Sequence, residues 1–276
     1  MDNNPWEPKR RIEHQLQRSL FTIGESMLED IEGLTDPFEI STVIRSWMKN
    51  MVFHHYAEKT AESLVGTLLK TSATTWRMAA RENSNGRVIY DALRKELQGS
   101  VGGLVALEIN RNAEIIKSLP LDIARQVTNY ISDESIKGRR AGDIAGDILR
   151  KFSGMTRNKA ALIARTEVSK TSTALTQARC ENIGLDWYRW RTSEDSRVRD
   201  SHRLMDGVLV KWTNPPSPER LEGLKNPPAP YHPGNIYNCR CYPGPVVNLD
   251  NVKWPAKVFS SGIITMMTRS QFERVA

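Results

Sequence analysis

The sequence predicts an α+β protein, with a mostly α-helical N-terminal region followed by a small C-terminal α+β domain that contains a short antiparallel sheet. Apolar residues recur at spacings of three and four along the first half of the chain, as they do on one face of a helix. From Trp187 onward the apolar period changes to two, which is typical of a half-buried strand. Hydrophobic residues make up 39% of the 276 residues, which is enough for a packed core.

The helical elements follow from this periodicity and from its breaks. Residues 8–33 form the first expected helix, and Asp36 caps a second one that begins at Pro37. Shorter helices are expected up to residue 152, and Thr156 is expected to cap a long helix over 157–183. We therefore predict three parts, which are a helical assembly region (1–154), a compact domain (155–248) and a C-terminal tail (249–276).

The strands of the compact domain are expected at 187–191, 208–212 and 240–247. Residues 214–230 hold six of the 14 prolines and show no periodicity, so they are expected to form an extended loop. No apolar run is long enough for a membrane span, and the N-terminus lacks the apolar segment of a secretion signal. Three cysteines argue against a disulfide framework and favour a reducing compartment.

The chain carries a net charge of +7, which favours contact with an anionic partner such as nucleic acid. The basic residues are spread out, so the sequence gives no support for sequence-specific DNA recognition. Two short stretches are candidates for phosphate contact, a basic turn and an aromatic strand interleaved with arginines. The candidate residues are Arg139, Arg140, Arg189 and Arg191.

Histidines and cysteines cluster between residues 195 and 241, where two of the five histidines and two of the three cysteines lie. Zinc binds thiolate and imidazole groups in a tetrahedron, so this clustering predicts a small metal site. Cys239 and Cys241 are two residues apart, and in a strand their sulfurs would point to the same side.

An ordered set of short motifs extends over about residues 155–248. It consists of Arg165-Thr166-Glu167, Trp190, Asp195-x-Arg197-x4-His202-x3-Asp206-Gly207, His232-Pro233 and Cys239-Arg240-Cys241. In order and spacing this set resembles the phage head morphogenesis domain of the Mu F-like minor head proteins. The resemblance implies a non-enzymatic minor capsid protein of a tailed bacteriophage.

The resemblance also implies partners and a place in the virion. Such proteins associate with the portal, or with the major capsid or scaffolding proteins, and several copies can be present. They lie at the portal vertex or in the capsid interior after assembly in the host cytoplasm. Non-specific contact with packaged or ejected DNA is implied as well, and no contact with a membrane is expected.

Many members of this family carry Cys-x-x-Cys or Cys-x-x-His ahead of the Asp-Gly pair, whereas this sequence has Arg199 at the first position and keeps His202 at the second. The ligand set implied for zinc is therefore His202, Cys239 and Cys241, with His232 as the fourth ligand. A site without metal is the alternative, in which the cysteines are buried apolar groups and a hydrogen-bonded brace fixes the loops. The residues expected in that brace are Arg165, Glu167, Asp195, Arg197 and Asp206.

Two other functions stay open from the residues alone. A metal-dependent nuclease or hydrolase could use Asp195, Asp200, His202, Asp206 and His232 around a catalytic ion. Because the histidines lie beside cysteines, a closed structural site is favoured and no catalysis is predicted. A non-specific nucleic-acid-binding module is the second alternative, and it predicts an affinity that falls steeply with salt.

Overall fold

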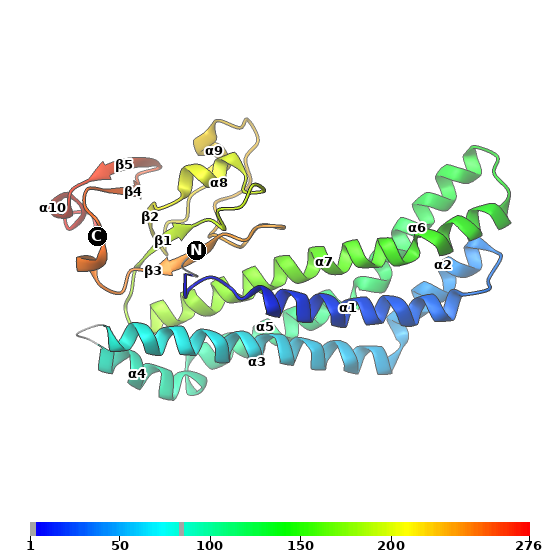
Figure 1. The fold of residues 1–276 in the computed structure, drawn as a ribbon, viewed down its shortest axis with the longest axis horizontal. Helices are drawn as coiled ribbons and strands as arrows, with labels where there is room; N and C mark the ends of the chain where they lie inside the picture. The colour runs from blue at the N-terminus through cyan, green and yellow to red at the C-terminus, as the bar shows by residue number, and fades with distance from the viewer. Residues whose placement is uncertain (1–3, 83–85) are drawn as a thin grey trace. The chain divides into compact units, whose positions relative to one another are not determined.

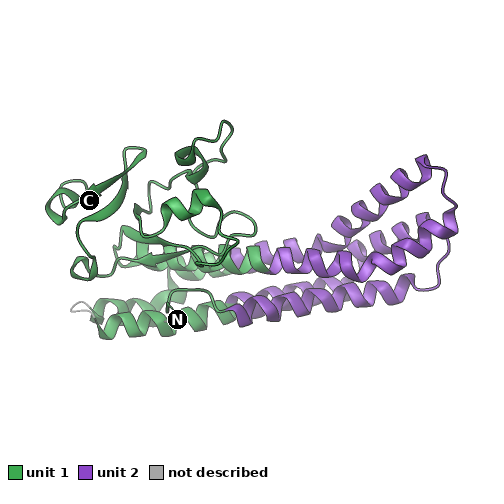
Figure 2. Ribbon diagram, turned by 45° about the horizontal axis from the view of Figure 1, so that its top comes forward, with its two compact units in different colours: residues 1–9, 66–106, 165–276 green, residues 10–65, 107–164 purple. Residues whose placement is uncertain are grey.

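The computed structural model describes residues 4–82 and 86–276, and its contacts divide the chain into two compact units (Figure 2). Unit 1 comprises residues 1–9, 66–106 and 165–276, and unit 2 comprises residues 10–65 and 107–164. Each unit therefore combines segments that lie far apart in the sequence.

Helices dominate the first two thirds of the chain (Figure 1). The longer ones are α1 (Arg10–Ile31), α2 (Pro37–Ser46), α3 (Met51–Arg81), α4 (Gly86–Lys95), α5 (Ser100–Lys117), α6 (Leu119–Ile136) and α7 (Ala141–Asn182). Three short helices come later in the chain, α8 (Asp200–Met205), α9 (Pro218–Glu222) and α10 (Arg269–Phe272). None of the helices in the described part of the chain has the length and apolarity needed to cross a bilayer.

Unit 2 is a helical unit whose first two helices confirm the predicted pattern. The α1 stripe is buried, with Leu20, Met27 and Ile31 at 0% exposure. The Asp36 side chain accepts a hydrogen bond of 2.9 Å from the Phe38 N–H, which caps α2 as predicted.

The predicted break at residues 153–156 is wrong, because α7 continues through this stretch as one helix of 42 residues. Thr156 lies inside the helix, is 1% exposed and donates its hydroxyl to the Ser153 carbonyl at 3.1 Å. A Cβ added at Gly24 would lie 2.7 Å from the Thr156 Cβ, so α1 and α7 approach closely here. This contact stabilises helical geometry where the local Ser-Gly-Met-Thr sequence indicates a turn.

Unit 1 contains a five-stranded sheet in the order β3-β1-β2-β4-β5 among the described residues. The strands are β1 (Trp187–Arg191), β2 (Leu209–Lys211), β3 (Tyr242–Pro245), β4 (Ala256–Ser260) and β5 (Ile263–Met267). β1 pairs antiparallel with β2 and β3, placing Arg189 opposite Gly244. The α+β class is confirmed, but the sheet is mixed because β2 and β4 pair in parallel. The periodicity of the sequence did not predict β4, β5 and α10, which occupy the stretch interpreted as a tail.

The two faces of β1 contribute to different apolar clusters, as a period of two requires. Tyr188 and Trp190 are 0% exposed and pack in a cluster with Trp76, Cys180 and both late cysteines. On the other face, Trp187 packs against Phe272 of α10 with ring centroids 4.7 Å apart. One face of β1 therefore shares a core with the helices of unit 1 and with Cys239 and Cys241.

A buried ion pair ties the helices of unit 1 together. The Arg179 guanidinium on α7 donates two hydrogen bonds to Glu96, at 2.7 Å and 3.0 Å. It also donates to the Leu69 carbonyl of α3 at 3.2 Å and to the Ser72 hydroxyl. The two charged side chains are only 4% and 11% exposed, so each depends on the other for its solvation.

Candidate functional site

Three of the four predicted metal ligands lie together beneath the sheet of unit 1. His202 comes from α8, and Cys239 and Cys241 come from the segment just ahead of β3. The His202 Nδ1 atom lies 3.3 Å from the Cys241 sulfur and 3.5 Å from the Cys239 sulfur. The three side chains offer ligand atoms that all lie within 4.8 Å of one another. All three are buried, at 2–3% exposure, so the cluster is closed to solvent.

The other nitrogen of His202 is held by a hydrogen-bonded relay that the sequence did not predict. The His202 Nε2 atom is 2.8 Å from the Tyr231 hydroxyl, which donates to the Glu219 carboxylate at 2.7 Å. Because the Tyr231 hydrogen points to Glu219, its oxygen accepts the hydrogen of His202 Nε2. This assigns the tautomer and leaves the Nδ1 lone pair facing the two sulfurs. Burial and then the hydrogen bond to Glu219 raise the pKa of Tyr231, so its hydroxyl stays protonated.

The two cysteines share their hydrogen bonds with each other. The Cys241 backbone N–H donates to the Cys239 sulfur at 3.4 Å. A hydrogen bond from the Cys241 thiol is the main cause that lowers the pKa of Cys239. The same pairing with Cys239 raises the pKa of Cys241. One sulfur is therefore readily ionised while the other holds its proton.

These residues fit a zinc ion in donor type and spacing, and among the described residues they supply three of the four ligands of a tetrahedral site. A tetrahedral zinc ion at about 2.3 Å from sulfur and about 2.1 Å from nitrogen separates its ligand atoms by roughly 3.4–3.8 Å. The observed nitrogen–sulfur distances of 3.3 Å and 3.5 Å lie close to that range. Metal-bound histidines also donate their second N–H to a polar partner, as His202 does to Tyr231. The Glu219 Oε2 atom is buried and has no hydrogen-bond partner among the described residues, so the relay is incomplete at this end.

His232, the predicted fourth ligand, lies elsewhere in the same unit. Its Nδ1 atom is 3.1 Å from the Tyr188 hydroxyl, and its ring packs 5.1 Å from the Trp212 ring. Burial lowers the pKa of His232 from 6.5 to about 4, so the ring is neutral in the folded protein. His232 therefore contacts Tyr188 and Trp212 and helps to fix its own loop, and it does not join the His202–Cys239–Cys241 cluster.

The depressed pKa of His232 predicts a loss of stability in mild acid. The unfolded chain binds a proton at His232 below pH 6.5, whereas the folded chain does so only below about pH 4. The free energy of unfolding is therefore expected to fall between these values, by roughly 2–3 kcal/mol at pH 4.5. Urea titrations at several pH values measure it, with the His232→Gln protein as the control. Parallel pH curves for the two proteins would contradict the assignment.

The residues expected in the brace contact different partners. Arg165 donates to the Asn238 side chain at 3.0 Å, and Thr166 accepts from the Asn238 N–H at 3.2 Å. These contacts fix Asn238 at a φ of 58°, directly before Cys239. Asp206 instead accepts from the Thr192 N–H at 2.9 Å and the Thr192 hydroxyl at 3.1 Å, at the end of β1.

The acidic and basic members of the Asp195 loop lie near one another. An Asp195 oxygen is 3.4 Å from the Arg197 guanidinium and 3.9 Å from that of Arg240. Glu167 is buried on α7, with Lys170 at 3.9 Å. Of these contacts, the one between Asp195 and Arg240 links the Asp195 loop to the residue between the two cysteines.

The four arginines predicted to contact nucleic acid belong to different units. In unit 2, Arg139 donates to Glu134 at 2.7 Å and to Asp147 at 2.6 Å. Its positive charge is therefore paired with two carboxylates of the same unit. Arg140 beside it is exposed. In unit 1, Arg189 and Arg191 line a cavity.

Comparison with known proteins agrees with the resemblance found in the sequence. Residues 125–243 match the family described as Phage Mu protein F like protein, and this segment contains all of α7, strands β1 and β2 and the His202–Cys239–Cys241 cluster. The resemblance to the Mu F-like family is thereby confirmed over that segment.

One relative shares more of the chain than the family segment. An uncharacterized protein of Haemophilus influenzae (strain ATCC 51907 / DSM 11121 / KW20 / Rd) is 34% identical over 160 residues, which are 58% of this chain. Those residues are 32% of the relative, so this chain spans about a third of that protein's length. No solved structure matches.

Proposed function

We propose that this chain is a structural protein of phage head assembly that associates with the portal vertex or the capsid interior. The match of residues 125–243 to the Mu F-like family carries the proposal. The matched segment ends in a buried cluster that joins a helix, a loop and a strand, as a structural role requires. Contact with the portal, the capsid shell or packaged DNA is part of the proposal.

The cluster geometry favours a structural role over hydrolysis. A catalytic metal keeps an open position for water or substrate, and here the three ligand side chains are nearly inaccessible. Among the described residues, no carboxylate joins His202, Cys239 and Cys241 within ligand distance of one another. Asp195, Asp200 and Asp206 therefore do not surround a common ion with His202.

Assembly of phage heads with and without the protein tests the proposal. The chain would be produced together with the portal, scaffolding and major capsid proteins of the same phage, and the heads purified and imaged. We expect the protein to co-purify with heads and to add density at the portal vertex or inside the shell. Heads that form equally well and never retain the protein would refute the proposal. So would plasmid cleavage with divalent metal that the His202→Ala protein has lost.

We further propose that zinc occupies the His202–Cys239–Cys241 cluster and serves a structural role. The two thiolates and the Nδ1 atom would hold the ion, which would lock the strand β3 segment to α8. The support is the distance match, the buried donor set and the polar relay behind His202. In this arrangement the metal replaces the weak sulfur–imidazole hydrogen bonds as the link between these elements.

Zinc content measures this second proposal directly. Protein purified without added metal is expected to hold about one zinc per chain, and the His202→Ala protein to hold less than about a tenth of that. His232→Gln is the matched control, because it changes a buried histidine of the same unit that lies outside the cluster and should retain the metal. A ratio of zinc to protein near zero in the unmodified protein would refute the zinc proposal and favour the hydrogen-bonded cluster without metal.

A further inference from the structure

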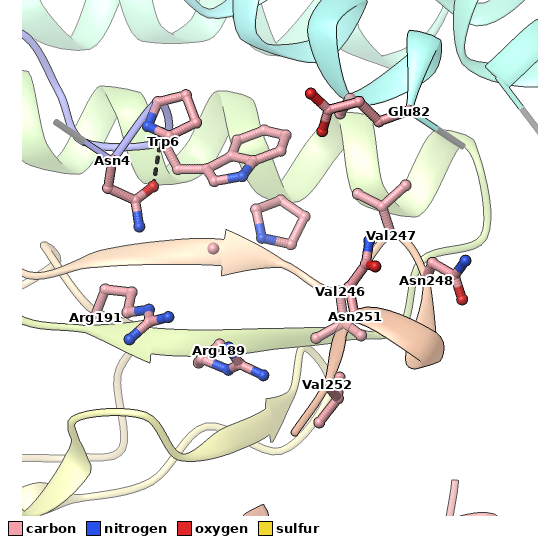
Figure 3. A pocket seen from close by; sticks show the side chains of 14 residues that line it. Asn4, Trp6, Glu82, Arg189, Arg191, Val246, Val247, Asn248, Asn251 and Val252 are labelled. Carbon is pink, nitrogen blue, oxygen red and sulfur yellow. Dashed lines mark hydrogen bonds between the residues drawn. The ribbon is translucent and has the colours of Figure 1, made fainter. Parts of the chain in front are cut away.

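A cavity of about 300 Å³ lies within unit 1, on the side of the sheet that carries the charged residues of β1 (Figure 3). Its walls come from the N-terminal segment, from the end of α3, from β1 and from the segment around β3. The lining includes the charged residues Glu82, Arg189 and Arg191 and the aromatic ring of Trp6. It also includes Asn4, which is polar, and Gly244, which has no side chain. This cavity is separate from the His202–Cys239–Cys241 cluster and has no part in the proposed zinc site.

Two guanidinium groups share this cavity, and neither forms an ion pair with a carboxylate of the described residues. Arg189 and Arg191 are two residues apart on β1, so their side chains leave the same face of the strand. Both are partly buried, and among the described residues neither side chain has a hydrogen bond or an ion pair. Burial and then repulsion from Arg191 lower the pKa of Arg189, and the more distant Asp206 carboxylate offsets this only in part. A bound anion would offset the repulsion between these two partly buried cations.

The backbone opposite the arginines leaves room for a ligand. Gly244 pairs with Arg189 across the strands, and a Cβ added to it would lie 3.8 Å from the Arg191 Cγ atom. The missing side chain keeps this part of the cavity open above the two arginine stems. Glycine in a strand is found where another group must approach the backbone closely.

An aromatic wall completes the cavity. Trp6 packs edge-on against Trp76, with centroids 5.0 Å apart and planes at 81°. The Thr75 hydroxyl donates to the Pro5 carbonyl at 2.9 Å and anchors the N-terminal segment beside it. The tryptophan is therefore positioned before any ligand arrives, and Figure 3 shows it across β3 from the two arginines. Planar nitrogen bases stack on such rings, and guanidinium forks bind phosphate oxygens in pairs.

We propose that this cavity binds the phosphate of a nucleotide, with Arg189 and Arg191 as the phosphate ligands and Trp6 as the surface for the base. The volume is at the lower end for a small-molecule site, which suits one nucleotide and excludes a duplex. The Asn4 amide and the Glu82 carboxylate supply polar groups for the sugar or base edge. The nucleotide is either free or part of a single strand, because both present the same phosphate and base. Binding of a free nucleotide would be independent of the proposed role in head assembly, whereas binding of a strand would be one form of the DNA contact proposed above.

Titration calorimetry on the full chain tests the inference with four probes. These are inorganic phosphate, adenosine monophosphate, adenosine and a ten-nucleotide single-stranded DNA. The phosphate-bearing probes are expected to bind, and adenosine about tenfold more weakly than its monophosphate or weaker still. The double variant Arg189→Gln/Arg191→Gln should weaken binding about a hundredfold, since each charged hydrogen-bonding group contributes about a factor of ten. Arg220→Gln, at an exposed arginine of the same unit, is the matched control and should bind as the unmodified protein does.

Thermal melting separates a binding role from a structural one. In phosphate-free buffer, the double variant is expected to melt at a higher temperature than the unmodified protein, because it removes two crowded, partly buried charges. Phosphate should then raise the melting temperature of the unmodified protein and leave that of the variant unchanged. Tight binding of DNA alone, lost in the variant, would identify a strand as the source of the nucleotide. Equal binding of adenosine and its monophosphate, unchanged binding by the variant, or no binding of any phosphate probe would each overturn the proposal.

Discussion

Replacement of Arg179 by methionine is expected to destabilise unit 1 by about 3–5 kcal/mol, because it leaves the Glu96 carboxylate buried without its cation. Arg179 provides both hydrogen bonds to Glu96, at 2.7 Å and 3.0 Å, and also contacts Leu69 and Ser72 on α3. The loss would therefore loosen the packing of α3 and α7 within this unit. Guanidinium denaturation followed by tryptophan fluorescence measures the change, since six of the seven tryptophans belong to unit 1.

A double substitution distinguishes the effect of an unpaired buried charge from the effect of lost packing. The Arg179→Met/Glu96→Met protein removes both charges and is expected to recover most of the lost stability, because an apolar pair of similar volume replaces a buried ion pair at little cost. Arg220→Met at an exposed position should change stability by no more than about 0.5 kcal/mol. A double variant as unstable as Arg179→Met would show that the guanidinium acts by packing and by its α3 contacts.

Replacement of Gly234 by valine is expected to cost about 2–5 kcal/mol, the sum of backbone strain and overpacking. Gly234 has a φ of +86°, and a Cβ there would lie 2.9 Å from the Thr173 hydroxyl and 3.1 Å from the Cys241 carbonyl. The same turn is tied to α7 by a hydrogen bond of 2.7 Å from Thr173 to the Pro233 carbonyl. The His-Pro-Gly sequence thus presses the loop against α7 next to the cysteines, and thermal melting would report its loss.

Gly262→Ala is the matched control for the backbone part of this effect. Gly262 has a φ of +82° in the same unit, but an added Cβ there would meet nothing within 4 Å. This substitution should cost only about 1–2 kcal/mol. If Gly234→Ala and Gly262→Ala were equally destabilising, the close approach to Thr173 and Cys241 would contribute nothing to the loss of stability at Gly234.

The parts of the fold that sequence could predict are those with strong local periodicity. The apolar stripe of α1 and the Asp36–Pro37 start of α2 follow from local rules, and so does the alternation in β1. The continuity of α7 does not, because it depends on Gly24 accepting Thr156 from a distant part of the chain. The parallel pairing of β2 with β4 is equally non-local. It places Leu209 opposite Val258, and the sequence of neither short strand predicts that pairing.

The candidate site shows the same division. Spacing alone suggested that Cys239 and Cys241 share a side, and His202 joins them in the structure. Nothing in the sequence separates His202 from His232 as ligands, since both lie between residues 195 and 241. Their difference arises from burial against Trp212 and from the Tyr231–Glu219 relay, whose members come from a stretch without periodicity. The sequence offered one indication of the relay, which is Tyr231 at the end of the proline-rich loop. An aromatic side chain at that position is expected to be buried, and a buried hydroxyl needs a hydrogen-bond partner.

The parallel pairing of β2 with β4 has a consequence for where this chain can be shortened. The family segment ends at residue 243, ahead of β4, yet β2 is an interior strand only because β4 covers its free side. A protein cut after residue 248 would convert β2 into an open rim, with Leu209 uncovered. Such a fragment would tend to recruit strands from neighbouring copies and precipitate, so residues 249–276 protect this edge of the sheet by pairing with β2.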